Sequence, residues 1–328
     1  MEIAKKIMEG DIRTASMLIR ELEDRRPQAK STVNHIYPIT GKAHILGFTG
    51  SEGSGKSTLI NETIAELRRR GKKVGVLPVD TSSVFSGGAL LGDRIRMGSH
   101  AKDPDVFIRS MASRGALSGL CPAIGDAIHV MDSMGKDVII LETVGAGQMG
   151  TEVVNYAHTV IVVQAPGLGD EIQVLKAGIL EIADIFVVNR ADQEGAGKLY
   201  RELMYMLGMI QHYPGGWRPP IVRTENPLDQ EAFQRSIAEL VDLTEQHYQN
   251  IIEHDLLSER LSRRVMMELK EAFEAVMLEP VARQLRESGK FDQFVDILMK
   301  KESDPMTLIE EYLASRPRIQ HRLRVDST

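Results

Sequence analysis

The feature that most constrains this chain is the segment at residues 50–58, which reads GSEGSGKST and matches the pattern G-x-x-x-x-G-K-[S/T] at every fixed position. Its glycines leave room for successive backbone N–H groups to turn toward phosphate oxygens. Lys56 can neutralise charge on the β- and γ-phosphates, and the Ser57 hydroxyl can take one coordination position on Mg²⁺. The predicted nucleotide-binding residues here are Gly50, Ser51, Glu52, Gly53, Ser54, Gly55, Lys56, Ser57 and Thr58.

The flanks of this segment agree with a phosphate-binding loop. Residues 44–49 form a short apolar run typical of a buried strand, and residues 59–70 have the pattern of a helix closed by Gly71. A strand, a glycine turn and a helix are the context that the motif requires, and the first N–H groups of the helix favour anion binding.

Further buried runs at residues 73–80, 137–145, 160–165 and 184–188, with a short strand within 213–227, predict an α/β fold. We expect a P-loop NTPase with a mainly parallel central sheet flanked by helices, plus helical N-terminal and C-terminal extensions. Residues 103–135 are expected to form a loop and a helix. Right-handed crossovers place the carboxyl ends of the parallel strands on the ligand side of the sheet.

Acidic residues stand at two of these strand ends. Asp80 and Glu142 follow apolar runs, a position that commonly holds Mg²⁺ near a phosphate loop. Asp93 lies in a Ser- and Gly-rich stretch, where it either senses the γ-phosphate or caps a helix. Gln148 either orients an attacking water or is a solvated loop residue. The predicted catalytic residues are Lys56, Asp80, Glu142 and Gln148, and the predicted metal ligands are Ser57, Asp80, Asp93 and Glu142.

The fifth strand runs into the sequence NRAD at residues 189–192, which discriminates between bases. Guanine presents two neighbouring N–H donors, and one carboxylate can accept a hydrogen bond from each of them. Adenine does not present such a pair of donors. Asp192 therefore favours GTP over ATP. Asn189 is expected to tie the surrounding loops together and to touch the base edge.

Composition limits the other classes of function. The net charge is −6 with both signs interspersed, which argues against a protein that coats nucleic acid or an anionic membrane. No run approaches the roughly 18 apolar residues of a membrane span. The lone Cys121 cannot form an internal disulfide, which suits a reducing cytoplasm.

The chain divides into three predicted parts: a helical N-terminal extension at residues 1–40, a P-loop domain at 41–230 and a helical region at 231–328. Helical spacing in the first part involves Ile3, Ile7, Met8, Ala15, Leu18, Ile19 and Leu22. In the last part an apolar stripe steps by fours through Leu257, Leu261, Val265, Leu269 and Phe273. That stripe packs either on a partner subunit, in a homodimer, or back on the same chain.

Taken together, these motifs resemble the MeaB/ArgK/methylmalonic-aciduria-type-A family of GTPases, which chaperone adenosylcobalamin-dependent acyl-CoA mutases. The resemblance covers essentially the whole chain. It rests on residues 50–58, on VDTSS at 79–83, SGGALLGDR at 86–94, DP at 103–104, VFIR at 106–109, ETVG at 142–145, GQ at 147–148, PG at 166–167, GDE at 169–171, and on Asn189 with Ala191 and Asp192.

The resemblance implies roles for further residues. Asp80, Asp93 and Glu142 would surround Mg²⁺, and the C-terminal helices would form a dimerisation arm. A loop carrying Asp170, Gln173 and Lys176 would act as an additional switch that reports the bound nucleotide to the mutase; from spacing alone, Asp170 is a helix N-cap. Binding and hydrolysis of GTP would gate the delivery of adenosylcobalamin.

The chain departs from the family pattern at three places. Arg190 replaces the usual Lys of Asn-Lys-x-Asp, and its aliphatic stem can still cover the base. Met149 and Gly150 stand where the family has Ser-Glu. Glu225 and Asn226 replace the Ser-Ala that normally braces guanine. These departures indicate a divergent branch of the family, serving a mutase other than the methylmalonyl-CoA enzyme.

Two other functions fit parts of the sequence. An ATP-dependent small-molecule kinase would need an acceptor pocket with a base, and Asp192 should not then disfavour adenine. A nickel-delivery GTPase of related architecture would need clustered His and Cys ligands, whereas the nine histidines are scattered and Cys121 has no second cysteine to pair with.

Overall fold

A computed structural model describes residues 2–80, 100, 102–112, 123–143, 152–168, 180–225 and 229–315 of the chain. These residues fall into two compact units, Met1–Met267 and Glu268–Thr328. The boundary between the units lies within helix α12 (Leu257–Phe273). The three-part division with boundaries near residues 40 and 230 stays a prediction.

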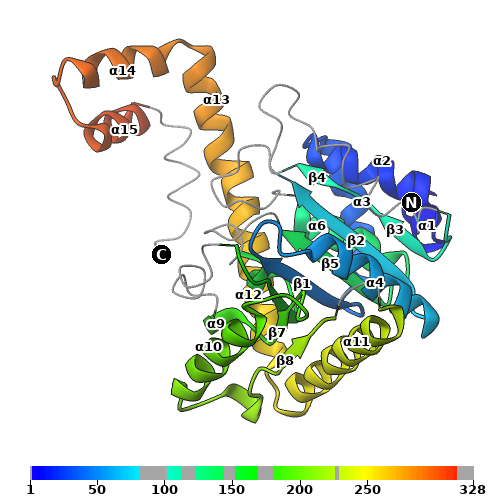
Figure 1. Ribbon diagram of the computed structural model, residues 1–328. Helices are drawn as coiled ribbons and strands as arrows, with labels where there is room; N and C mark the ends of the chain where they lie inside the picture. The colour runs from blue at the N-terminus through cyan, green and yellow to red at the C-terminus, as the bar shows by residue number, and fades with distance from the viewer. Residues whose placement is uncertain are drawn as a thin grey trace. The chain divides into compact units, whose positions relative to one another are not determined.

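The first unit is built on one parallel sheet (Figure 1). Its described strands follow the order β3-β2-β5-β1-β6-β7-β8, and β4 pairs with β2 beyond β3. The strands are β1 (His44–Gly50), β2 (Val74–Asp80), β3 (Val106–Ile108), β4 (Met111–Ala112), β5 (Val138–Thr143), β6 (Thr159–Gln164), β7 (Ile185–Val188) and β8 (Ile221–Arg223). The predicted α/β class with a parallel sheet is confirmed.

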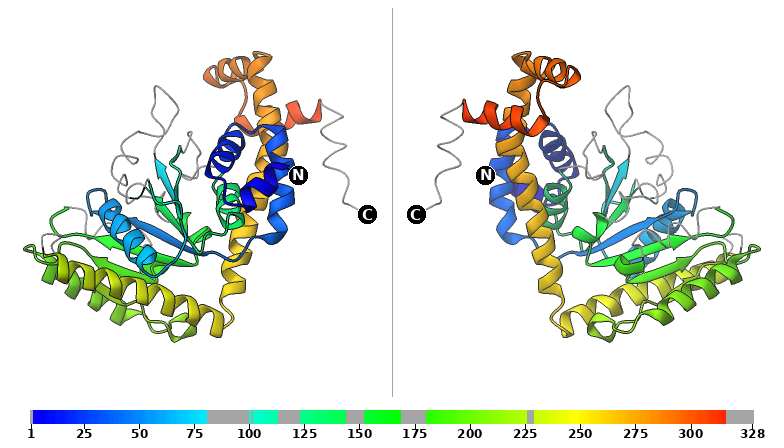
Figure 2. Two further views of the ribbon diagram at one scale, coloured as in Figure 1. Left: turned by 90° about the vertical axis from the view of Figure 1, so that its right-hand side faces the viewer. Right: turned by 90° about the vertical axis from the view of Figure 1, so that its left-hand side faces the viewer.

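Successive side chains along each strand point to opposite faces of the sheet, and the core is therefore divided into two layers. Leu46 and Phe48 of β1 face α4 (Lys56–Arg69) and α11 (Gln230–Glu253). Ile45 faces the opposite side, where α6 (Ile124–Ser133) and α10 (Ala196–Met209) pack. Figure 2 shows the sheet between α4 and α11 on one side and α6 with the N-terminal helices on the other. Burial on both faces explains why these strands appear as nearly continuous apolar runs.

The N-terminal extension forms three helices, α1 (Glu2–Met8), α2 (Ile12–Glu23) and α3 (Pro27–Ile36). Asp11 caps α2 by accepting a hydrogen bond from Thr14 N at 2.6 Å. Ile7 and Ile19 are fully buried in the layer that contains α6, as the helical spacing predicts. Ile3 and Met8 were expected on the same apolar face, but both are close to half exposed. That part of the prediction is wrong, because this short helix buries only Ala4 and Ile7.

Two edge strands were not predicted. β3 and β4 lie within residues 103–135, where a loop and a helix were expected, and they comprise three and two residues. Both pair in parallel with β2. The predicted helix is present as α6. Shorter elements are the 3-10 turns Tyr37–Ile39, Glu152–Asn155 and Pro214–Gly216 and the helical turn α9 (Leu180–Ile182).

The second unit is helical. α12 passes through a π-helical stretch at Glu274–Leu278 into α13 (Glu279–Glu287), followed by α14 (Lys290–Met299) and α15 (Pro305–Ala314). Pro280 is the second residue of α13, and the π-helical stretch, where the regular hydrogen-bond ladder is interrupted, lies directly before that helix. Asp304 caps α15 by accepting hydrogen bonds from Met306 N and Thr307 N.

A buried polar network fixes the amino-terminal edge of the sheet. The Asp184 carboxylate, directly before β7, accepts from both terminal nitrogens of Arg260 at 2.8 and 2.7 Å and lies 3.2 Å from His247 Nε2. Burial alone would raise the pKa of Asp184, but the bonds from His247 and Arg260 outweigh it and hold that pKa well below its ordinary value. Arg260 also donates to His158 O at 2.7 Å. The network thereby ties the start of α12 to β6 and β7.

Within the part of the chain that the structure describes, no helix has both the length and the hydrophobicity to cross a lipid bilayer.

The buried His158 predicts acid sensitivity of the fold. Burial, with nearby Arg264 and Arg260, lowers its pKa from 6.5 to about 3. The unfolded chain binds this proton below pH 6.5 and the folded chain does not until about pH 3, so the free energy of unfolding falls as the pH drops through that window. We expect this residue to account for about 2 kcal/mol between pH 7 and pH 5.

Denaturant unfolding at pH 7, 6 and 5 measures this loss. In the parent chain Ile45 N donates a hydrogen bond to His158 Nδ1 at 3.2 Å. The asparagine in His158→Asn can still accept this hydrogen bond, but its side chain does not titrate. The stability of this variant should therefore depend less on pH than that of the parent chain. The exposed His212 provides the matched control, because His212→Asn should leave the pH dependence unchanged. Equal pH slopes for the parent chain and His158→Asn would contradict the assignment.

Candidate functional site

Several of the predicted site residues that the structure describes lie together where the parallel strands end. β1 lies between β5 and β6, and Gly50 at its carboxyl end is in register with Val163 of β6. Gly50 has φ +139°, and a Cβ there would lie 1.9 Å from Val163 O. Only glycine can leave the strand here, because any side chain would collide with the backbone of β6. The segment at residues 50–58 therefore starts at the centre of the sheet edge.

The turn itself requires left-handed backbone at Gly53 (φ +77°) and Gly55 (φ +88°). Gly55 is the residue before α4, so the chain passes from this turn directly into the helix. A Cβ on Gly55 would lie 2.3 Å from Asn189 Nδ2. The first N–H groups of α4 are thus held beside the turn, in the arrangement that binds phosphate at a helix N-terminus.

The Lys56 side chain folds back over the loop. Its Nζ donates to Gly50 O and Ser51 O, both at 2.9 Å, and the residue is buried. Burial lowers the pKa of Lys56, and the negative charges of Glu142 and Glu52 partly oppose that shift. The ammonium therefore sits in a weakly solvated position next to the concave backbone, where an incoming phosphate would be strongly attracted.

Ser57 and Glu142 come together as predicted for the metal site. Ser57 Oγ donates to Glu142 Oε1 at 2.7 Å, and Glu142 is the residue before the end of β5, next to the strand that carries the loop. A hydroxyl and a carboxylate are hard oxygen ligands of the kind that Mg²⁺ prefers. These two groups fit Mg²⁺ whose other ligands are water and nucleotide phosphate. The described residues contain no group of three His, Cys, Asp or Glu side chains that could hold a metal by themselves.

Asn189 ties three loops together. Its Nδ2 donates to Ser54 O at 2.7 Å, and its Oδ1 accepts from Thr224 Oγ1 at 2.7 Å and from Arg190 N at 3.0 Å. The side chain is buried. This is the loop-tying role expected from the sequence, whereas contact with the base edge stays a prediction.

Two supporting residues were not predicted. Thr224 follows β8, is completely buried, and exchanges backbone hydrogen bonds with Val188 and Ala191 in addition to holding Asn189. Gln164 ends β6, where its Oε1 accepts from Ser51 Oγ at 3.2 Å. Their position in the sequence could have indicated this role, because each is a polar residue at the carboxyl end of an apolar strand, on the edge of the sheet that carries the site.

The remaining predicted residues divide into those that the structure describes and those that it does not. Glu52, Thr58 and Asp192 are exposed, and Glu225 is half-buried directly after Thr224. Gln148, Asp93, Asp170, Gln173, Lys176 and Asn226 lie outside the described residues, as does the side chain of Asp80, whose backbone ends β2. The roles assigned to them stay predictions.

Comparisons with known proteins agree with this geometry. The family model described as methylmalonyl Co-A mutase-associated GTPase MeaB matches residues 15–285. A Pyrococcus horikoshii protein that carries a GTPase name is 44% identical over 93% of this chain and 94% of its own length. The Escherichia coli GTPase ArgK is 36% identical over 63% of this chain and 65% of its own length.

A crystal structure of an LAO/AO transport system kinase superposes with a TM-score of 0.65 at 23% identity. It covers 94% of this chain and 95% of that one. At this identity the likeness supports the fold alone.

Gly55→Ala tests the close approach of Asn189 to the loop. The alanine Cβ would displace the Asn189 amide and open the turn, so we expect at least a tenfold loss of GTP affinity, roughly 1.4 kcal/mol. Titration with a fluorescent GTP analogue measures it.

Gly71→Ala is the matched control. Gly71 also has a positive φ (+78°), but nothing lies within 4 Å of its Cβ position. Both variants therefore carry a backbone cost of about 1 kcal/mol, and only Gly55→Ala adds the clash. Equal GTP affinity for the two variants would show that the Asn189 contact does not shape the site.

Proposed function

This chain belongs to the family of the methylmalonyl-CoA mutase-associated GTPase MeaB, and we propose that it uses GTP to gate the loading, protection or reactivation of an adenosylcobalamin-dependent acyl-CoA mutase. The observation that carries the proposal is the joined set of Lys56, the Ser57–Glu142 pair and Asn189 on one edge of the sheet. Phosphate, metal and base contacts of a nucleotide switch would all meet there.

Hydrolysis in this proposal depends on charge and positioning more than on covalent chemistry. The Lys56 ammonium and the N–H groups of the loop would stabilise charge that develops on the β- and γ-phosphates. Ser57 and Glu142 would hold Mg²⁺, which supplies further charge neutralisation when bound. Asp80 and Asp93 are proposed as additional acidic residues, and Gln148 as the residue that orients the attacking water. Because none of these motifs contains a clear arginine finger, intrinsic turnover should be slow.

Recognition of guanine is proposed for the loop after β7. Asp192 would accept the two neighbouring donors of guanine, and Glu225 with Asn226 would lie near the base from the segment after β8. Asp192 and Glu225 closely follow Asn189 and Thr224 in the chain, and the hydrogen bond between Asn189 and Thr224 holds both loops, which supports this assignment.

Asp170, Gln173 and Lys176 are proposed as the switch segment that contacts the mutase. Loss of the γ-phosphate would release loops that its contacts had ordered, and the partner would sense that change. The departures at Arg190, Gly150 and Glu225 support a branch whose client is not the methylmalonyl-CoA enzyme. We expect this protein to work in the cytoplasm.

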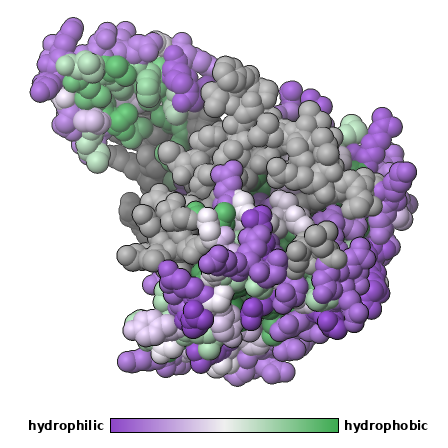
Figure 3. All heavy atoms as spheres, in the orientation of Figure 1, coloured by the Kyte–Doolittle hydropathy of each residue, from purple (hydrophilic) through white to green (hydrophobic). Residues whose placement is uncertain are grey.

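The second unit supports a homodimer. Only three hydrophobic side chains of Glu268–Ser315 are buried among the described residues, namely Leu285, Leu308 and Tyr312. Exposed ones include Leu269, Phe273, Val276, Leu278, Phe291, Val295, Met299, Met306 and Ile309. Figure 3 shows hydrophobic residues gathered over α13 to α15. An apolar surface that the unit does not cover itself is typical of a subunit interface, and we propose that a second copy covers it.

Asp192→Asn tests the choice of base. The amide replaces one acceptor with a donor, so GTP binding should weaken at least tenfold, while xanthosine triphosphate, whose 2-keto group accepts a hydrogen bond, should bind better than before. Competition titrations with GTP, xanthosine triphosphate and ATP measure the three affinities. An unchanged order of affinities, or equal use of ATP by the parent chain, would favour the kinase alternative.

Stimulated hydrolysis tests the proposed client. The rate of GTP hydrolysis should rise with one member of a panel of adenosylcobalamin-dependent acyl-CoA mutases and stay at its basal value with the others. Lys56→Ala should abolish turnover in both conditions while leaving the circular dichroism spectrum intact. If no mutase changes the rate, the GTPase assignment stands and the client assignment fails.

A further inference from the structure

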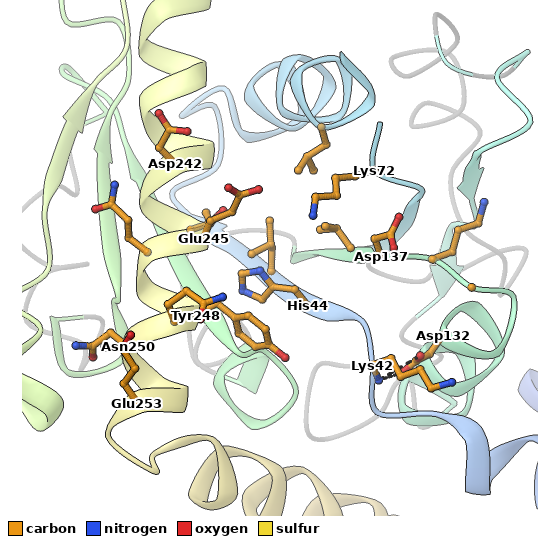
Figure 4. Close-up of a pocket in the computed structure, with 18 of the residues that line it drawn as sticks. Lys42, His44, Lys72, Asp132, Asp137, Asp242, Glu245, Tyr248, Asn250 and Glu253 are labelled. Carbon is orange, nitrogen blue, oxygen red and sulfur yellow. Dashed lines mark hydrogen bonds between the residues drawn. The ribbon is translucent and has the colours of Figure 1, made fainter. Parts of the chain in front are cut away.

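Polar side chains at the two edges of the sheet differ in how fully the fold satisfies them. Figure 4 shows the cavity at the amino edge, where the Asp132 carboxylate accepts from Lys42 N at 3.1 Å. Asp137, in the same cavity, accepts from Lys73 N at 2.7 Å. Gln164 stands at the opposite edge, at the end of β6, and is completely buried. Its Nε2 has no hydrogen-bond partner among the described residues.

A glutamine at this position is unfavourable for the stability of the fold. The preceding residues 160–163 of β6, and Ala165 after it, are apolar and fully buried. A buried amide donor without an acceptor loses its hydrogen bonds to water, whereas an apolar side chain of similar shape has none to lose. A half-satisfied group of this kind calls for a reason other than packing. The other end of the amide supplies one.

That other end of Gln164 holds the phosphate loop. Its Oε1 accepts from Ser51 Oγ at 3.2 Å, and both residues are buried. A hydroxyl can donate or accept, so the contact persists in either orientation of the amide. The backbone carbonyl of Gln164 also accepts from Asn189 N at 2.7 Å. One residue therefore connects the phosphate loop with the segment that follows β7.

Ser51 in turn holds the ammonium of Lys56. The Ser51 carbonyl accepts from Lys56 Nζ at 2.9 Å and from Ser54 N at 3.2 Å. Gly50 and Gly53, with φ +139° and +77°, lie on either side of the peptide that carries this carbonyl. Glycines leave the backbone free to rotate. The bond from the Ser51 hydroxyl to Gln164 therefore restrains the direction in which the carbonyl points.

We propose that Gln164 is a positioning residue for GTP hydrolysis, an inference that rests on the proposed function. The amide fixes the Ser51 hydroxyl, the Ser51 carbonyl fixes the Lys56 ammonium, and that ammonium meets the charge that develops on the phosphates. A small displacement of a catalytic group costs more in the transition state than in the binding of the ground state. Loss of the Gln164 amide should therefore lower turnover more than it lowers affinity for GTP.

Gln164→Leu and Ser51→Ala each remove the contact between β6 and the loop. Each should lower kcat about tenfold and change GTP affinity less than about threefold. Because both act through one hydrogen bond, the double variant should also lose about tenfold, and not about a hundredfold. Ser236→Ala is the matched control. Ser236 is buried to a similar extent, but its hydroxyl donates to Phe233 O of its own helix at 2.7 Å, so turnover should be unchanged.

The chemical reactivity of Lys56 tests the position of its ammonium without a GTPase measurement. Lys56 is buried, so access of the reagent limits its acetylation by acetic anhydride in the nucleotide-free chain. Gln164→Leu and Ser51→Ala should each speed this acetylation at least about threefold, because the released side chain reaches solvent more often. Peptide mass spectrometry measures the rate, with the exposed Lys73 as internal reference. Ser236→Ala should leave the rate at its parent value.

The two measurements separate this inference from the proposed function. A parent chain that does not hydrolyse GTP would defeat the proposed function, and the acetylation rates would still decide whether Gln164 positions Lys56. Unchanged acetylation, parent-like turnover in both variants, or additive losses in the double variant would each overturn the inference. Gln164→Leu should melt no lower than the parent chain, since it removes a buried donor that has no acceptor. Should it nevertheless fail to fold, Ser51→Ala provides the same two readouts.

Discussion

The close approach of Gly50 to Val163 O is the contact on which the rest of the site depends. It allows the chain to leave β1 while that strand remains between β5 and β6, buried on both faces. The neighbouring strands then deliver Glu142 and Gln164 to either side of the loop. A side chain at Gly50 would separate β1 from β6, and the Ser51 contact with Gln164 would be lost with the turn.

The sheet is stabilised differently at its two edges. At the carboxyl edge, uncharged groups such as Asn189 and Thr224 hold the loops through short hydrogen bonds, leaving charge for the ligand. At the amino edge, Asp184 is buried and satisfied by Arg260, His247 and Val160 N. Removing one partner there would leave a buried charge uncompensated, which is strongly destabilising. The amino edge thus anchors α11 and α12 through His247 and Arg260.

The sequence allowed the central strands and the loop to be predicted because both are dictated locally. Buried parallel strands are continuous apolar runs, and Lys56 and Ser57 occupy fixed positions in their motif. β3 and β4 escaped prediction because edge strands of two or three residues carry too few side chains for a pattern. Thr224 and Gln164 escaped it because their roles arise from register between strands. Ile3 was predicted to be buried because of its helical spacing, yet it is close to half exposed, so helical spacing alone does not guarantee burial.

Arg190 illustrates how a departure from a family pattern is accommodated. Its backbone adopts φ +55°, an uncommon conformation that brings its N–H to Asn189 Oδ1 at 3.0 Å. From there its guanidinium reaches across to the phosphate loop and Nη2 donates to Gly53 O at 3.1 Å. A lysine has a point charge with no planar fork, whereas arginine can satisfy this carbonyl and still cover neighbouring surface with its stem. Arg190 therefore joins the loop after β7 to the phosphate loop, so an arginine at this position preserves a connection between the two loops.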